Sequence, residues 1–136
     1  MSYALSAALQ TAIYEALLTE PALGALVGSD IYDALPSGVL PPLYVSIGAE
    51  TVRAAGDATG DGAVHDVQVS VVTDQPGFAA AKAVAAVVSD TLHGADLALS
   101  RGRLVYLNFQ RAVAARTDGA AGRTINLRFR ARVEDI

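Results

Sequence analysis

The sequence contains no cysteine and no tryptophan, and it has one lysine beside nine arginines. Without cysteine, the chain can form no disulfide, thiolate metal site or cysteine nucleophile. No stretch approaches the roughly 18 consecutive apolar residues of a membrane-spanning helix, and no basic segment precedes an apolar run at the N-terminus. We therefore expect no signal peptide, and a protein made in a reducing bacterial cytoplasm.

Charge is scarce and unevenly placed. Charged residues make up 18% of the 136 positions and hydrophobic residues 52%, which is typical of one folded domain, 1–136, and not of a disordered chain. Two basic and eleven acidic residues give residues 1–100 a charge of −9, whereas eight arginines and three acids give residues 101–136 a charge of +5. This asymmetry indicates either an anionic partner or self-association through opposite ends of the molecule.

Two stretches have the apolar periodicity of helices. Apolar residues recur at helical spacing over residues 5–17, where Ser2 can cap the helix and Pro21 ends it. A second helix is expected to begin after Asp74 as its cap, with Pro76 in its first turn and an apolar stripe from Phe78 to Leu92. Both helices are apolar on one side, so we expect them to pack on a sheet.

Alternating apolar and polar residues predict the strands. In the first long one, Val45 and Ile47 face inward and Glu50 faces outward. A short turn is expected at residues 23–27. The fold class that follows is α+β, with two helices packed on a mostly antiparallel sheet and a long C-terminal β-hairpin. The long strands are expected over residues 43–50, 64–73, 104–115 and 124–134, and residues 30–32 could form a brief one.

The C-terminal hairpin is long for a domain of this size. Matching its apolar faces pairs Val113 with Leu127 and Phe109 with Ala131. Each arm has about 12 residues, or roughly 40 Å, whereas strands usually have about 5–6 residues. We therefore expect part of this ribbon to project from the globule and to pair with another molecule. Arg111, on the otherwise apolar face near the tip, supports a projecting end.

Few residues suggest chemistry. Residues 57–62 have the oxygen spacing of the first half of an EF-hand loop, but the twelfth position is Gln68 and not glutamate, so a solvated turn is favoured over a calcium site. His65 and His93 are the only histidines, and we expect structural roles for both. No nucleophile elbow, Walker loop, zinc motif or dinucleotide fingerprint is present. We expect no enzymatic activity, no metal and no cofactor.

Arg128, Arg130 and Arg132 alternate along the last strand and therefore point to one side, about 6–7 Å apart. Three interpretations stay open. The arginines could contact nucleic-acid phosphates, although an isoelectric point of about 4.9 and the lack of interleaved aromatic residues argue against this. They could simply be solvated, or they could meet the acidic part of a neighbouring copy. A contact between unlike surfaces closes a ring or grows a filament.

Several segments together resemble a known family. They are Ile31-Tyr32-Asp33-Ala34-Leu35-Pro36 leading to Leu43-Tyr44-Val45-Ser46-Ile47-Gly48, a Gly/Asp-rich loop, and residues 67–73 followed by Gly77-Phe78-Ala79-Ala80-Ala81-Lys82. With the closing hairpin, this order is similar to the tail-completion or tail-terminator proteins of long-tailed phages and gene transfer agents.

The resemblance implies a structural protein without catalytic residues. Such subunits form rings, usually hexameric, that cap the tail tube and join it to the head-side neck. The implied partners are other copies of the chain, the tail-tube protein and the head-side connector, with no membrane partner. DNA would pass through the ring without recognition of its sequence. The implied location is the head–tail junction of a phage-like particle. The alternatives are a head-side connector of the same particle and, less favoured, a nucleic-acid-binding module.

Two sets of residues are expected to make these contacts. The first would form the subunit interface, by pairing with carboxylates of a neighbour, or line the lumen: Arg111, Arg128, Arg130 and Arg132. The second lies in the loop expected to touch the tail tube or the neck: Asp57, Thr59 and Asp61.

Overall fold

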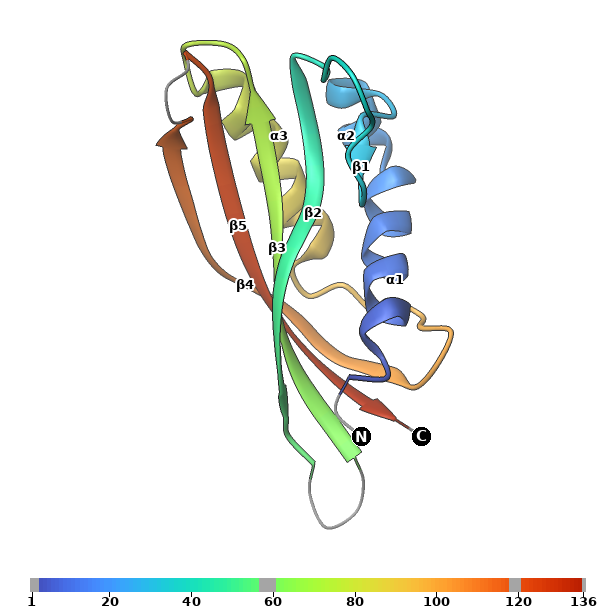
Figure 1. Ribbon diagram of the computed structural model, residues 1–136. Coiled ribbons are helices and arrows are strands. Elements are labelled where there is room, and N and C mark those ends of the chain that lie inside the picture. Colours follow the sequence, from blue (N-terminus) through green and yellow to red (C-terminus); the bar gives the residue numbers. More distant parts are fainter. Residues whose placement is uncertain (1–2, 57–60, 118–120, 136) are drawn as a thin grey trace.

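The computed structural model describes residues 3–56, 61–117 and 121–135. Three helices cover one face of a five-stranded sheet with the strand order β1-β2-β3-β5-β4 (Figure 1). Only β1 and β2 pair in parallel among these strands, so the predicted α+β class with a mostly antiparallel sheet is confirmed. The elements are α1 (Ser6–Leu18), α2 (Pro21–Val27), β1 (Ile31–Tyr32), β2 (Leu43–Ala54), β3 (Asp61–Thr73), α3 (Ala79–Leu92), β4 (Arg103–Arg116) and β5 (Arg123–Asp135).

Helix α2 is a third helix where the sequence indicated only a turn. Pro21 follows the end of α1 and then starts α2, because a first helical position needs no N–H. The Glu20 side chain accepts a hydrogen bond from the Ala22 N–H at 3.2 Å, and Gly28 ends the helix with a φ of +60°. Seven residues are too few for a recognisable apolar period, which is why the pattern missed this helix.

Helix α3 starts later than predicted. Its N-cap is Phe78, and no side chain caps it, so the predicted cap at Asp74 is wrong. The Asp74 N–H instead donates to the Pro42 carbonyl at 3.0 Å, which ties the segment before α3 to the start of β2. The predicted cap of α1, Ser2, lies outside the described residues. Within the described part of the chain, no helix is long and apolar enough to cross a membrane.

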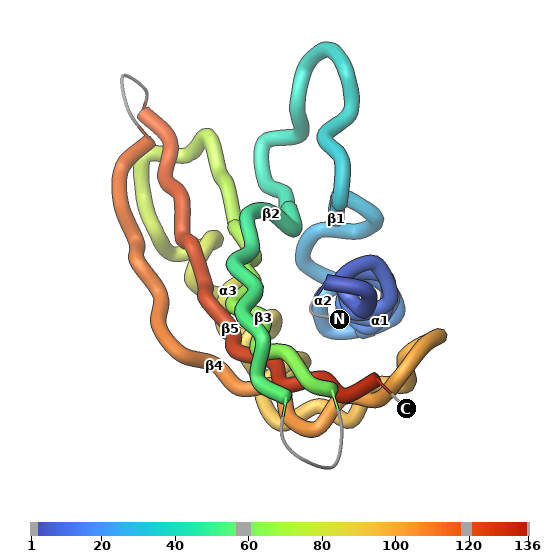
Figure 2. Tube along the Cα trace, turned by 60° about the horizontal axis from the view of Figure 1, so that its bottom comes forward, coloured from blue at the N-terminus to red at the C-terminus, as the bar shows by residue number. Residues whose placement is uncertain are grey.

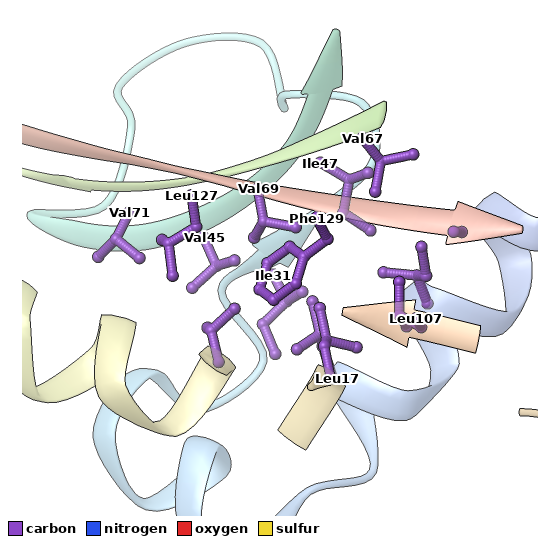
Figure 3. Close-up of a cluster of buried hydrophobic side chains, with 14 of the residues drawn as sticks. Leu17, Ile31, Val45, Ile47, Val67, Val69, Val71, Leu107, Leu127 and Phe129 are labelled. Carbon is purple, nitrogen blue, oxygen red and sulfur yellow. The ribbon is translucent and has the colours of Figure 1, made fainter. Parts of the chain in front are cut away.

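The core lies between the sheet and the three helices. Phe129 of β5 is fully buried at its centre and is surrounded by side chains from both layers, including Leu17, Ile31 and Leu107 (Figure 3). Most residues of the apolar stripes of α1 and α3 are buried. So are all the apolar residues that alternate along β3 and β5, namely Val67, Val69, Val71, Ile125, Leu127, Phe129, Ala131 and Val133. Alternation with period two therefore predicts these two central strands correctly.

A β-bulge in β2 reverses its alternation. Ile47 pairs with Val69, but Glu50 pairs with Val67, so β2 has one extra residue between these pairs. Glu50 therefore shares the helix-covered face with Val67, and the prediction that it faces outward is wrong. Gly48 lies within the bulge, as is usual where a strand must bend.

The hairpin of β4 and β5 also differs from the predicted register. Phe109 pairs with Phe129 and not with Ala131, and a bulge between Phe109 and Arg111 then shifts the pairing again. Leu127 faces Ala112 in place of the predicted Val113. The two extra residues in β4, one between Leu104 and Tyr106 and one between Phe109 and Arg111, could not be read from its composition.

The hairpin is also not a free ribbon. Strand β5 is paired along its whole length with β3, from Asp61↔Asp135 to Thr73↔Arg123, so it is a central strand. The prediction of a projecting ribbon is therefore wrong for β5. It holds in a weaker form for β4, the outermost strand, in which residues 109–116 are all exposed.

At the other edge, a short strand and an exposed loop complete the sheet. Because β1 and β2 are parallel, the chain between them must run back along the sheet before β2 begins. β1 has only two residues, so this return path is short, and residues 33–42 span it. Residues 33–40 of this loop are all exposed. Figure 2 shows the loop standing away from the sheet, on the flank opposite to β4.

Candidate assembly interface

The face of the sheet that the helices leave open carries the predicted arginines. Arg130 Nε donates to Asp66 Oδ1 at 2.8 Å, and Arg53 approaches the other oxygen of Asp66 at 3.5 Å. The hydrogen bond and charge of Asp66 raise the pKa of Arg130. Arg132 donates to the Ala55 carbonyl at 2.8 Å. These two arginines are therefore held by their own chain.

Arg128 and Arg111 are arranged differently. The bulge in β4 places them directly opposite each other across the β4–β5 pair, and both are exposed. In the described part of the chain, no carboxylate lies within 4.0 Å of either guanidinium. Like charges opposite each other destabilise a strand pair. Of the four predicted interface arginines, these two are available to an anionic group of another molecule.

The edge of β4 is covered only over its first half. The Gly94 N–H at the end of α3 donates to the Leu107 carbonyl at 2.7 Å, and the Phe109 N–H donates to His93 Nδ1 at 3.0 Å. His93 thus binds the edge of the sheet, which is a structural role as expected. Beyond Phe109, residues 110–116 are all exposed, so neither face of β4 is covered there. We call residues 110–116 the distal β4 segment.

The second histidine belongs to a buried polar cluster. His65 has no exposed surface, and its Nδ1 lies 3.4 Å from Glu50 Oε2, while the Ser6 hydroxyl donates to Glu50 Oε1. Partial burial opposes ionisation of Glu50, but hydrogen bonds from Ser6, Tyr3 and His65 outweigh it and lower the pKa of Glu50. The His65 Nε2 has no partner within the described residues.

This cluster does not have the geometry of a hydrolase. A catalytic triad needs the histidine between the serine and the carboxylate, whereas here Glu50 lies between Ser6 and His65. The complete burial of His65 also keeps substrate from it. Among the described residues, no group of three or more potential ligands could hold a metal ion. The cluster ties the start of α1 to β2 and β3.

The loop predicted to contact the tail tube is only partly described. Asp57 and Thr59 lie outside the described residues. Asp61 is the first residue of β3, is exposed, and pairs with Asp135 at the end of β5. Asp135 itself is held by Arg101 at 2.8 Å, and this hydrogen bond lowers the pKa of Asp135. This end of the sheet is therefore a second region of charged, exposed side chains.

Comparison with known proteins agrees with these features. The family described as "Tail completion protein gp17" matches residues 11–134. The chain belongs to this tail completion family. A solved structure described as "Virion of native gene transfer agent (GTA) particle" contains a chain that is 59% identical, with a TM-score of 0.93 over 98% of this chain and 99% of that chain. No curated protein matches the sequence.

The resemblance seen in the sequence is thus confirmed, and this tail completion protein is a structural tail-assembly protein. Sequence reasoning found its arginines but missed how they divide into satisfied and available ones. That division depends on the bulge in β4 and on Asp66 of the neighbouring strand β3. The alternation of Asp66 with Val67 indicates a negative charge on the open face, but it does not indicate that Arg130 pairs with that charge.

Proposed function

We propose that this tail completion protein is a tail terminator: a component of a phage-like particle that forms a ring at the end of the tail tube and joins it to the head-side neck. The carrying observation is the match over nearly the whole chain to a protein of a gene transfer agent virion, at 59% identity. The proposal includes no enzymatic activity. Its partners are other copies of the chain, the tail-tube protein and the head-side connector.

Two features of the fold support assembly with other copies. The distal β4 segment leaves part of a sheet edge without a neighbour in the described part of the chain, and such edges readily pair with another chain. Arg111 and Arg128 form a like-charged pair that an external carboxylate would neutralise. Exposed ion pairs contribute only about 0–1 kcal/mol each, so apolar burial supplies affinity and charge sets the register.

The test is the mass of the protein by light scattering, alone and mixed with the tail-tube protein. We expect a multiple of the 14.0 kDa chain mass, alone or on the tube. A chain that stays monomeric and does not bind the tube contradicts the proposal. Binding to the head-side connector without binding to the tube favours the connector alternative instead.

A nucleic-acid-binding module is less well supported. Arg130 and Arg132 are occupied by Asp66 and by the Ala55 carbonyl, so the regular arginine ladder is not free for phosphates. Binding of this kind weakens steeply with salt. Adding DNA at low and at high salt separates the two cases: a nucleic-acid module binds DNA with an affinity that falls steeply as salt rises, whereas a tail terminator forms its oligomer without DNA.

A further inference from the structure

We propose that the distal β4 segment of one copy packs against the opposite flank of the sheet in the next copy, namely β1 and the loop that follows it. We call residues 30–40 the β1 flank. This inference rests on the proposed ring and identifies its subunit contact. It commits to a second copy of this chain as the occupant of the open edge. Figure 1 shows these two regions on opposite flanks of the molecule.

The two regions lie at the same level of the sheet. The strand registers form one continuous row in which each residue pairs with the next: Ile31, Val45, Val71, Ile125 and Ala114. The adjacent row runs in the same way from Tyr32 to Val113. The two residues of β1 are therefore level with the middle of the distal β4 segment, across the whole width of the sheet.

The charges at this level are complementary. Asp30 and Asp33 flank β1, and Arg111 and Arg116 flank the exposed residues of the distal β4 segment. Three antiparallel pairings separate β2 from β4, so β4 runs opposite to β2 and to its parallel neighbour β1. Side by side in neighbouring copies, the two strands would be antiparallel. Asp33 would then lie near Arg111 of the next copy, and Asp30 near Arg116.

Apolar side chains are uncovered on both flanks. Val113, in the middle of the distal β4 segment, is 44% exposed although it belongs to a strand. On the β1 flank, Leu35 is 53% exposed, Val39 is 98% exposed and Leu40 is also exposed. Contiguous exposed apolar groups mark interaction sites. Packing of the loop over the open face of the distal β4 segment would bury Val113 together with these loop side chains.

The equal level has a consequence for symmetry. A contact between unlike surfaces gives a ring when repetition adds rotation without translation, and a filament when translation accumulates. Since both halves of the contact occupy the same rows, repetition adds little shift along the strands. The geometry therefore favours closure into a ring.

The test uses the absence of cysteine from the chain. Ala34→Cys on the β1 flank and Ala112→Cys on the distal β4 segment are mild changes at exposed positions. The two single variants are mixed, treated with a short bis-maleimide and separated by mass. We expect a cross-linked dimer from the mixture and several-fold less product from either variant alone, because each copy then has only one half of the contact.

The matched control replaces Ala34→Cys by Ala83→Cys, an exposed alanine on α3. This pair should give only the background yield. The same samples are weighed by light scattering. Background yield from the Ala34→Cys and Ala112→Cys mixture in an oligomeric sample would overturn the contact while leaving the ring intact. Background yield in a sample that is monomeric and ignores the tail tube would overturn both.

A charge exchange gives an independent check. Arg111→Asp alone should lower the cross-linking yield several-fold, because the carboxylate introduced there would repel that of Asp33. Asp33→Arg in the partner copy should restore the yield, since opposite charges face each other again. Loss without restoration would show that the two residues do not meet.

Discussion

Glu50 illustrates how a single residue can depend on the fold around it. A bulge turns its side chain beneath the start of α1, where Ser6 and His65 hydrogen-bond to the carboxylate. These bonds favour the ionised form and keep the pKa of Glu50 below its ordinary value, despite partial burial. An exposed glutamate at the same place in the sequence would carry no such coupling to stability.

The first prediction concerns this coupling. Because the pKa of Glu50 is lower in the folded chain than the unfolded value of about 4.3, its contribution to stability is present above that value and is lost as pH falls through the folded pKa. For Glu50→Gln we expect a free energy of unfolding lower by about 1–3 kcal/mol at neutral pH. Urea unfolding at neutral and acidic pH should show a shallower acid-induced loss in the variant, and equal losses would contradict the prediction.

A second residue-scale prediction concerns Gly102, just before β4. Its φ is +67°, and a Cβ there would collide with the Leu5 side chain and the Glu134 carbonyl. Gly102→Ala should therefore lower the free energy of unfolding by at least about 2 kcal/mol. Gly94→Ala is the matched control, since Gly94 has a φ of +71° but open space around it. Equal losses in the two variants would mean that the collision is relieved at little cost.

At the scale of the elements, the sequence predicts which residues are buried wherever burial follows the period of a strand or a helix without interruption. The inward faces of β3 and β5 and the stripe of α3 were predictable, because burial on one side imposes alternation or helical spacing. The bulges in β2 and β4 were not, since an extra residue leaves composition unchanged and reverses every later side chain. The partner of Arg130 was also hidden, because Asp66 is distant in sequence.

The bulge in β4 gives an element-scale prediction. Arg111→Thr removes one member of the like-charged pair and introduces a residue that favours strands. The free energy of unfolding should stay equal or rise by about 0.2–1 kcal/mol, while the mass by light scattering should shift toward the monomer. Arg130→Thr is the control on the same face. It should lower stability, because Asp66 would lose its hydrogen bond from Nε. A stability loss for Arg111→Thr would contradict this.

At the scale of the whole molecule, the division of charge along the chain becomes a division in space. The acidic β1 flank and the basic distal β4 segment lie at opposite edges of one sheet. The −9 and +5 of the two parts of the sequence indicated such an arrangement, but not its position. Only strand order and register could place the two regions at one level, since both depend on pairing between distant residues.

The whole-molecule prediction concerns salt. Raising the ionic strength from about 0.1 M to 1 M shortens the screening length from about 10 Å to 3 Å, so attraction between the two flanks should weaken. The apolar contacts are not screened, and we expect partial dissociation, visible as a lower mass by light scattering. Retention of the full mass in high salt would show that charge does not contribute to affinity.

The arginines that border the distal β4 segment also govern how two free subunits meet. Exposed edges of two identical proteins can pair with each other about a two-fold axis. Such a dimer would leave neither of these edges available to a further copy. Antiparallel pairing of two such segments centred between Val113 and Ala114 would set Arg111 of each against Arg116 of the other. Mutual repulsion at both ends disfavours this encounter. Under the proposed contact, the two arginines that attract Asp30 and Asp33 of the next copy would therefore also disfavour this two-fold pairing.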